Sequence, residues 1–163
     1  DKITPIGPKA RNLNKEFEFN EGEFNQLAYW MKRQIIEDYP MNLASPVDWT
    51  DETQNINDRV RSYLDVNCGH CHSPTGNANS TGLYLHLDET RDIHLGLYKK
   101  PVATGRGSGG FKYSIVPGQP EESILLHRMI SLDPGVMMPE SGRALSHTEA
   151  VEMVREWILV MED

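Results

Sequence analysis

The two cysteines of the chain constrain its fold more than any other feature. They stand three residues apart, and a histidine follows the second, so that residues 68–72 have the sequence Cys-Gly-His-Cys-His. With no other cysteine among 163 residues, a framework of disulfide bonds and a zinc site of four cysteines are both excluded. The two thiols and the histidine therefore have to be explained together, as one short segment.

The residues that precede the motif predict that it lies on a helix. Ile56, Val60 and Leu64 are spaced to share one helical face, which predicts a helix over 56–69. On such a turn, positions i, i+3 and i+4 point to the same side. Cys68 and Cys71 would then reach the two vinyl groups of a haem, and His72 would present an imidazole nitrogen to the iron. This spacing is typical of covalent haem c attachment.

Two other readings of the motif are weaker. A thioredoxin-like redox pair shares the spacing of the cysteines but expects a βαβ context, which the sequence does not show. A zinc site built from residues 68, 70, 71 and 72 would crowd four ligands onto adjacent turns. One covalent haem c is the expected cofactor.

Met138 is the expected distal ligand of the iron. It lies in Val-Met-Met-Pro-Glu at 136–140, a Gly/Pro-flanked stretch between two predicted helices, where a methionine has little reason to fill a core. Met137 is the alternative, because it is adjacent and points to a different side. His127 is the histidine held in reserve for a bis-histidine cytochrome. Methionine raises the reduction potential relative to a second histidine.

The haem propionates need hydrogen-bond donors, and the sequence offers several. Arg106, Lys112, Tyr113 and Trp157 are candidates, although Trp157 fits a role in the core equally well. His72 is expected to donate its other ring N–H to a backbone carbonyl of the stretch 74–82.

The remaining pattern predicts a chain made mostly of helices. Apolar spacing predicts helices over 22–38, 120–131 and 147–162, the last with Ser146 and Glu149 as a capping box. Alternation over 83–87 predicts one short strand in an otherwise loop-rich stretch. Residues 1–20 are expected to form an extended arm, and 40–55 a surface loop.

Composition narrows the classes of partner. The formal net charge of -8 argues against nucleic acid and anionic membrane surfaces, and favours a redox partner protein with a basic docking face. No apolar run reaches the length of a membrane span. The chain opens on Asp1, and we expect a mature protein or a domain cut from a longer one.

Further motifs carry a family resemblance. Gly-Leu-Tyr-Leu at 82–85, Pro-Gly-Gln-Pro-Glu-Glu-Ser at 117–123, Met-Pro at 138–139 and Trp-Ile at 157–158 follow the haem motif in order. Over about 56–162 the chain resembles the planctomycete-type branch of class I c-type cytochrome domains. In this branch Met-Pro is often followed by a second proline, where the chain has Glu140. The opening residues 7–14 look like part of a larger bacterial cytochrome family whose domains are fused to other modules.

The resemblance implies an all-α domain over 56–163 that wraps one haem, with residues 1–55 as a helical extension packing on it. It also implies His72/Met138 coordination and electron transfer, rather than enzymatic activity, in the periplasm or outside the cell. A periplasmic dehydrogenase or an oxidative polysaccharide-degrading enzyme is the suggested partner.

Two alternatives to an electron carrier remain. One is a haem enzyme or small-ligand sensor with an open or labile sixth site. The other is a haem-stabilised module that binds protein or glycan through the aromatic residues Tyr29, Trp30 and Trp49.

Overall fold

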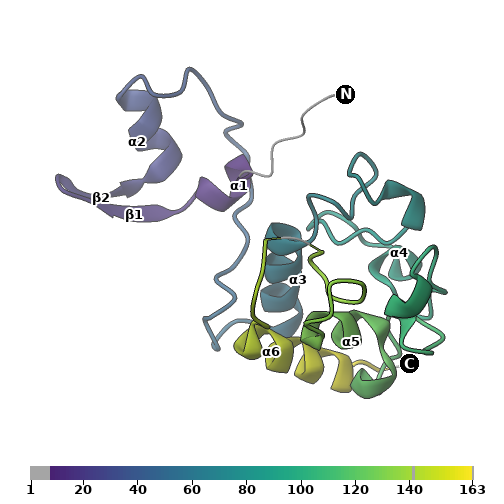
Figure 1. The fold of residues 1–163 in the computed structure, drawn as a ribbon. Helices are drawn as coiled ribbons and strands as arrows, with labels where there is room; N and C mark the ends of the chain where they lie inside the picture. Colours follow the sequence, from purple (N-terminus) through teal and green to yellow (C-terminus); the bar gives the residue numbers. More distant parts are fainter. Residues whose placement is uncertain (1–7, 141, 163) are drawn as a thin grey trace. The chain divides into compact units, whose positions relative to one another are not determined.

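The computed structural model describes residues 8–140 and 142–162, and the chain divides into two units, Asp1–Val47 and Asp48–Asp163 (Figure 1). The division comes eight residues before the predicted start of the haem domain at residue 56. The stretch that follows it belongs with the second unit, where Arg59 Nε donates to the carbonyl oxygen of Trp49 at 2.8 Å.

The first unit is a β-hairpin followed by a short helix. Helix α1 (Ala10–Leu13) leads into strands β1 (Glu16–Phe19) and β2 (Gly22–Asn25), and helix α2 (Gln26–Lys32) follows at once. The strands are antiparallel and pair Phe17 with Phe24. Asn25 caps α2 by accepting a hydrogen bond from the N–H of Ala28 at 3.1 Å. Tyr29 of α2 stacks on Phe19 with ring centroids 3.8 Å apart.

This hairpin overturns the prediction of an all-α fold. Glu16–Phe19 alternates charged and aromatic residues, which is the period of a strand, and Gly22 adopts a φ of 121° where the chain re-enters the second strand. The expected extended arm over 1–20 is therefore wrong, because residues 10–13 form α1 and residues 16–19 form β1 of the hairpin. Its residues 1–7 lie outside the described part of the chain.

The predicted helix over 22–38 is also wrong at both ends. Its first four residues form β2, and α2 ends at Lys32. Gln34 has a left-handed φ of 58°, which stops the helix. Met31 and Ile35, expected on a buried face, are 40% and 63% exposed.

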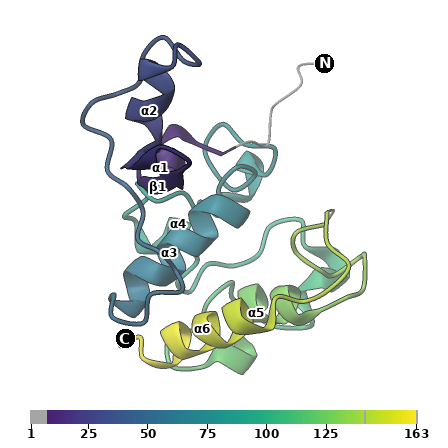
Figure 2. The ribbon, with the colours of Figure 1, turned by 90° about the vertical axis from the view of Figure 1, so that its left-hand side faces the viewer.

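Three helices build the core of the second unit: α3 (Ile56–Asn67), α5 (Ile124–Ile130) and α6 (Thr148–Leu159). Helix α6 packs against both of the others, and Figure 2 shows it running beside α5. Helices α3 and α6 lie within three residues of the predicted ranges, whereas α5 starts four residues later than predicted. The buried core consists of Val60, Tyr63, Leu64, Leu85, Ile115, Leu126, Met129, Ala150, Val151, Met153, Val154, Trp157 and Ile158.

The start of α5 and α6 differs from the prediction in detail. The expected helix over 120–131 is a 3₁₀ turn (Pro120–Glu122) and then α5, separated by the extended Ser123, whose hydroxyl accepts from the N–H of Val116 and donates to the carbonyl of Gln119. The capping box at α6 does not form. His147 is the residue before the helix, and the Ser146 hydroxyl donates to the carbonyl of Met129 instead.

The predicted strand over 83–87 does not form, because side chains of α3 take up its backbone groups. Arg61 donates to the carbonyl oxygens of His86, Leu87 and Glu89, and Asp65 accepts from the N–H of Leu87. Short helices accompany this segment and the loops around it: Asn79–Thr81, α4 (Asp92–Leu95) and Gly105–Ser108.

The Glu89 carboxylate, just after this segment, is held by Arg91 and His94. Its side chain is only 4% exposed and accepts two hydrogen bonds from the Arg91 guanidinium at 2.9 Å, with His94 Nδ1 at 3.1 Å. These bonds hold the pKa of Glu89 far below its usual range, against the opposing effect of burial. Across the described residues, no helix is long and apolar enough to cross a membrane.

Candidate functional site

The Cys-x-x-Cys-His motif continues the last turn of α3. Asn55 caps the start of this helix, and Cys68 is the residue that ends it, with its N–H bonded to the carbonyl of Leu64 at 2.9 Å. The N–H of His72 then bonds to the carbonyl of Cys68 at 2.9 Å, which is the i to i+4 step of a helical turn. Both cysteines are free thiols. The two thiols and the imidazole therefore belong to a single turn, as the spacing predicted.

The loop after the motif folds back onto it. The N–H of Ala78 donates to the carbonyl of Cys71 at 3.0 Å, and the N–H of Leu85 donates to the carbonyl of His72 at 2.8 Å. Gly76 is buried here, and a Cβ at this position would lie 2.2 Å from the Cys71 oxygen. Only glycine permits so close an approach, so the sequence itself fixes the loop against the motif.

Burial sets the protonation of His72. It lowers the pKa of the imidazole, and the nearby backbone of Leu83 opposes this to a smaller extent. His72 Nδ1 is enclosed and has no partner at normal hydrogen-bond geometry, which leaves the Leu83 backbone as its neighbour. Leu83 lies one residue beyond the stretch in which the acceptor was expected. A neutral imidazole is the form that binds metals.

Burial also sets the chemistry of Cys68. It raises the pKa of the Cys68 thiol to about 12, with a further contribution from Cys71. A thiol with so high a pKa is almost entirely protonated at neutral pH, and the thiolate is the species that exchanges with disulfides.

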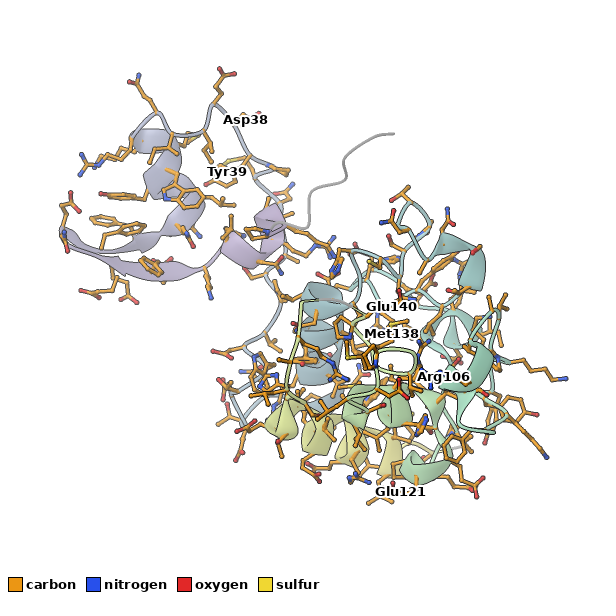
Figure 3. All side chains as sticks on the ribbon, in the orientation of Figure 1. Asp38, Tyr39, Arg106, Glu121, Met138 and Glu140 are labelled. Atoms are coloured by element: carbon orange, nitrogen blue, oxygen red, sulfur yellow. The ribbon has the colours of Figure 1, made fainter. Side chains whose placement is uncertain are left out.

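The loop that carries Met138 lies between α5 and α6, and the structure describes it over residues 131–140 and 142–147 (Figure 3). The N–H of Met138 donates to the carbonyl of Arg128 on α5 at 2.9 Å. The N–H of Met137 donates to the carbonyl of Asp133 at 2.7 Å. Both methionine side chains are half-buried. Glu140 of this loop raises the pKa of His72, while Arg128 lowers it. The charges that flank Met138 are therefore close enough to act on the imidazole.

Two arginines hold this loop, and no sequence motif indicated either of them. Arg128 Nε donates to the carbonyl of Val136 at 2.7 Å. Arg143 donates to the carbonyls of Met129, at 2.7 Å, and of Arg128 and Ser131. Arginines are usually exposed, so the sequence gives no reason to expect these two to bind backbone groups. Their closeness in sequence to Met138 is the one hint of such a role.

The predicted propionate donors are dispersed. The side chain of Arg106, labelled in Figure 3, is 68% exposed. It pairs with Asp133 of the Met138 loop at 2.8 Å. Tyr113 is half-buried and meets Tyr98 edge to face. Trp157 lies in the core, where its indole N–H donates to Asn57 Oδ1 at 3.1 Å.

Two pockets open elsewhere on the second unit. His127, the histidine held in reserve, lines one of about 280 Å³ together with Phe111 and Glu121. The other, of about 380 Å³, lies between the start of α3 and the end of α6. Neither is lined by Cys68, Cys71, His72 or Met138. Within the described ranges, no three or more histidine, cysteine or acidic side chains are grouped to hold a metal ion.

Comparison with known proteins gives no relative: no family model, curated protein or solved structure matches the chain.

Proposed function

We propose that the chain is a single-haem c-type cytochrome that transfers electrons. The observation that carries the proposal is the turn at residues 68–72, where the hydrogen bond from His72 N–H to the Cys68 carbonyl brings two free thiols and a half-buried imidazole to one turn. The donor set supports a haem, because it offers two thiols for the vinyl groups and an imidazole for the iron, with a half-buried methionine in the loop before α6.

The haem would supply an iron that alternates between two oxidation states, and the residues of the chain would hold it. Cys68 and Cys71 would attach it covalently. His72 would bind the iron, with its ring orientation supported by the Leu83 backbone. Met138 would supply the second protein ligand of the iron and would favour the reduced state relative to a second histidine.

An electron carrier needs a partner, and the net charge of -8 favours one with a basic face. A periplasmic dehydrogenase or an oxidative polysaccharide-degrading enzyme is the class of partner we propose. The place would be the periplasm or the outside of a bacterial cell. The resemblance to planctomycete-type cytochrome c supports this role, and the chain itself would not be an enzyme.

The first experiment measures covalent haem on the full chain, produced together with a haem-attachment system. A pyridine haemochrome assay on the denatured protein should give one haem per chain with both vinyl groups saturated. Cys68→Ala and Cys71→Ala should each leave a single thioether bond, with a shifted haemochrome band. Serine 73, next to the motif, offers a control: Ser73→Ala should retain both bonds. A wild-type chain without covalent haem would refute the proposal.

The second experiment identifies the distal ligand. The oxidised protein should show the weak far-red band of sulfur bound to iron, and Met138→Ala should abolish it. The neighbouring Met137→Ala is the matched control and should retain the band. If Met137→Ala alone abolishes it, the ligand is Met137. If the wild-type protein lacks the band and binds carbon monoxide or cyanide rapidly, a sensor or enzyme with an open sixth site replaces the electron carrier.

A further inference from the structure

We propose that Arg128 is a positioning residue for Met138. It holds the ligand segment 136–138 against α5 and keeps competing ligands from replacing the methionine sulfur. The inference rests on the proposed haem function, but it concerns contacts among residues of the chain itself.

Arg128 contacts the segment through both its backbone and its side chain. Its carbonyl accepts from the N–H of Met138 at 2.9 Å, and its Nε donates to the carbonyl of Val136 at 2.7 Å. One helical residue thus binds two groups of the ligand segment, on either side of Met137. A hydrogen bond from a charged donor is among the stronger ones in proteins.

The guanidinium of Arg128 packs against the backbone of Gly107. A Cβ built on Gly107 would come within 3.2 Å of both Nε and Cζ, so the guanidinium packs on a backbone without a side chain. Gly107 itself is buried. Burial lowers the pKa of Arg128, and Glu140 opposes this effect. The arginine stays charged because its ordinary pKa is far above neutral.

Arg143 strengthens the same attachment from the other direction. It lies on the Met138 loop and donates to the carbonyls of Arg128, Met129 and Ser131, at and just beyond the end of α5. A cation is favoured at the carboxyl end of a helix. Arg128 therefore fixes the loop before Met138, and Arg143 fixes it after.

Arg155 shows what an arginine of the second unit does without such a role. It lies on α6 and pairs with Glu121 and Glu152, which lie outside the Met138 loop and are 70% and 63% exposed, where ion pairs contribute little. Arg155→Gln is therefore the matched control for Arg128→Gln. Arg128→Lys completes the set, because it keeps the positive charge but loses the fixed geometry of Nε.

The test titrates imidazole against the oxidised full-length proteins and follows the loss of the far-red sulfur band. Arg128→Gln and Arg128→Lys should both bind imidazole about tenfold more tightly than wild type, which corresponds to losing a bond of about 1.4 kcal/mol. Arg155→Gln should bind imidazole as wild type does. If Arg128→Lys matches wild type, charge alone matters and the positioning role is overturned. If Arg128→Gln also matches wild type, the role is absent.

Hydrogen exchange separates this inference from the haem proposal. Whether or not haem is attached, the amide of Met138 should exchange about tenfold faster in Arg128→Gln than in Arg155→Gln, because the segment 136–138 loses the hydrogen bond from Arg128 Nε to the Val136 carbonyl. Equal exchange in the two variants would overturn the inference. Absence of covalent haem in the wild-type chain, by contrast, would overturn the haem proposal. The exchange result would still show whether Arg128 holds the segment 136–138.

Discussion

The two units of the chain differ in how they are held together. Among the described residues of the first unit, Leu27 is the sole buried one, and aromatic side chains such as Phe17 and Phe24 stay 48% and 39% exposed. The second unit encloses a core contributed by three helices, together with the buried charges Arg61, Asp65 and Glu89. Hydrophobic stabilisation scales with buried apolar area, so the second unit should be much the more stable.

The largest expected effect comes from a core substitution in the second unit. Leu64 is fully buried, so Leu64→Ala should lower the free energy of unfolding of that unit by about 3 kcal/mol. Leu27→Ala in the first unit should leave the second unit unchanged and accelerate hydrogen exchange only within residues 8–47. Exchange followed by mass spectrometry resolves both effects, with Leu145→Ala, 78% exposed, as the control. An equal loss of protection across both units in Leu27→Ala would contradict the comparison.

A smaller effect is expected from the buried carboxylate. Glu89→Gln should lower the free energy of unfolding by about 2 kcal/mol at pH 7, because a buried charged group loses its bonds to Arg91. The folded-state pKa of Glu89 is depressed, so its contribution is complete above the unfolded pKa of about 4.5 and decreases as pH falls below it.

Denaturant unfolding at pH 7 and pH 3.5 measures this dependence. The difference between wild type and Glu89→Gln should shrink at the lower pH, and Glu52→Gln, an exposed glutamate of the same unit, should show no difference at either. A gap that widens on acidification would mean that Glu89 is protonated in the folded protein.

The smallest expected effect is that of removing the first unit. The core of the second unit draws all its members from residues 48–163. A chain of residues 48–163 should therefore attach haem, show the far-red band and unfold at the denaturant concentration of the full chain. Absorbance during unfolding provides the measurement. Loss of cooperativity or of haem attachment would show that residues 1–47 contribute to the stability of the second unit.

Much of the second unit could be predicted from the sequence, because its helices carry their own signals. The apolar periods of α3 and α6 and the spacing of residues 68–72 are local, and the structure places them within a few residues of the predicted ranges. The haem, the electron-transfer role and the family resemblance stay predictions. The all-α class was wrong because the alternation in Glu16–Phe19 was taken for an extended arm.

The errors within the second unit came from partners distant in sequence. Alternation at 83–87 predicted a strand, but a strand needs a neighbour, and the side chains of Arg61 and Asp65 bind its backbone groups instead. Arg128 was overlooked for the same reason, since its value depends on Val136 and Gly107, which no local pattern connects with it.

The packing of α6 on α3 has a consequence for the order of events during synthesis. Residue 72 is synthesised 76 residues before Thr148, where the helix that closes the core begins. Until α6 (Thr148–Leu159) has been made, the apolar face of α3 that carries Val60 and Leu64 lacks the helix against which it packs. The second unit can therefore complete its core only after α6 has been synthesised, although the residues of the 68–72 turn are made much earlier.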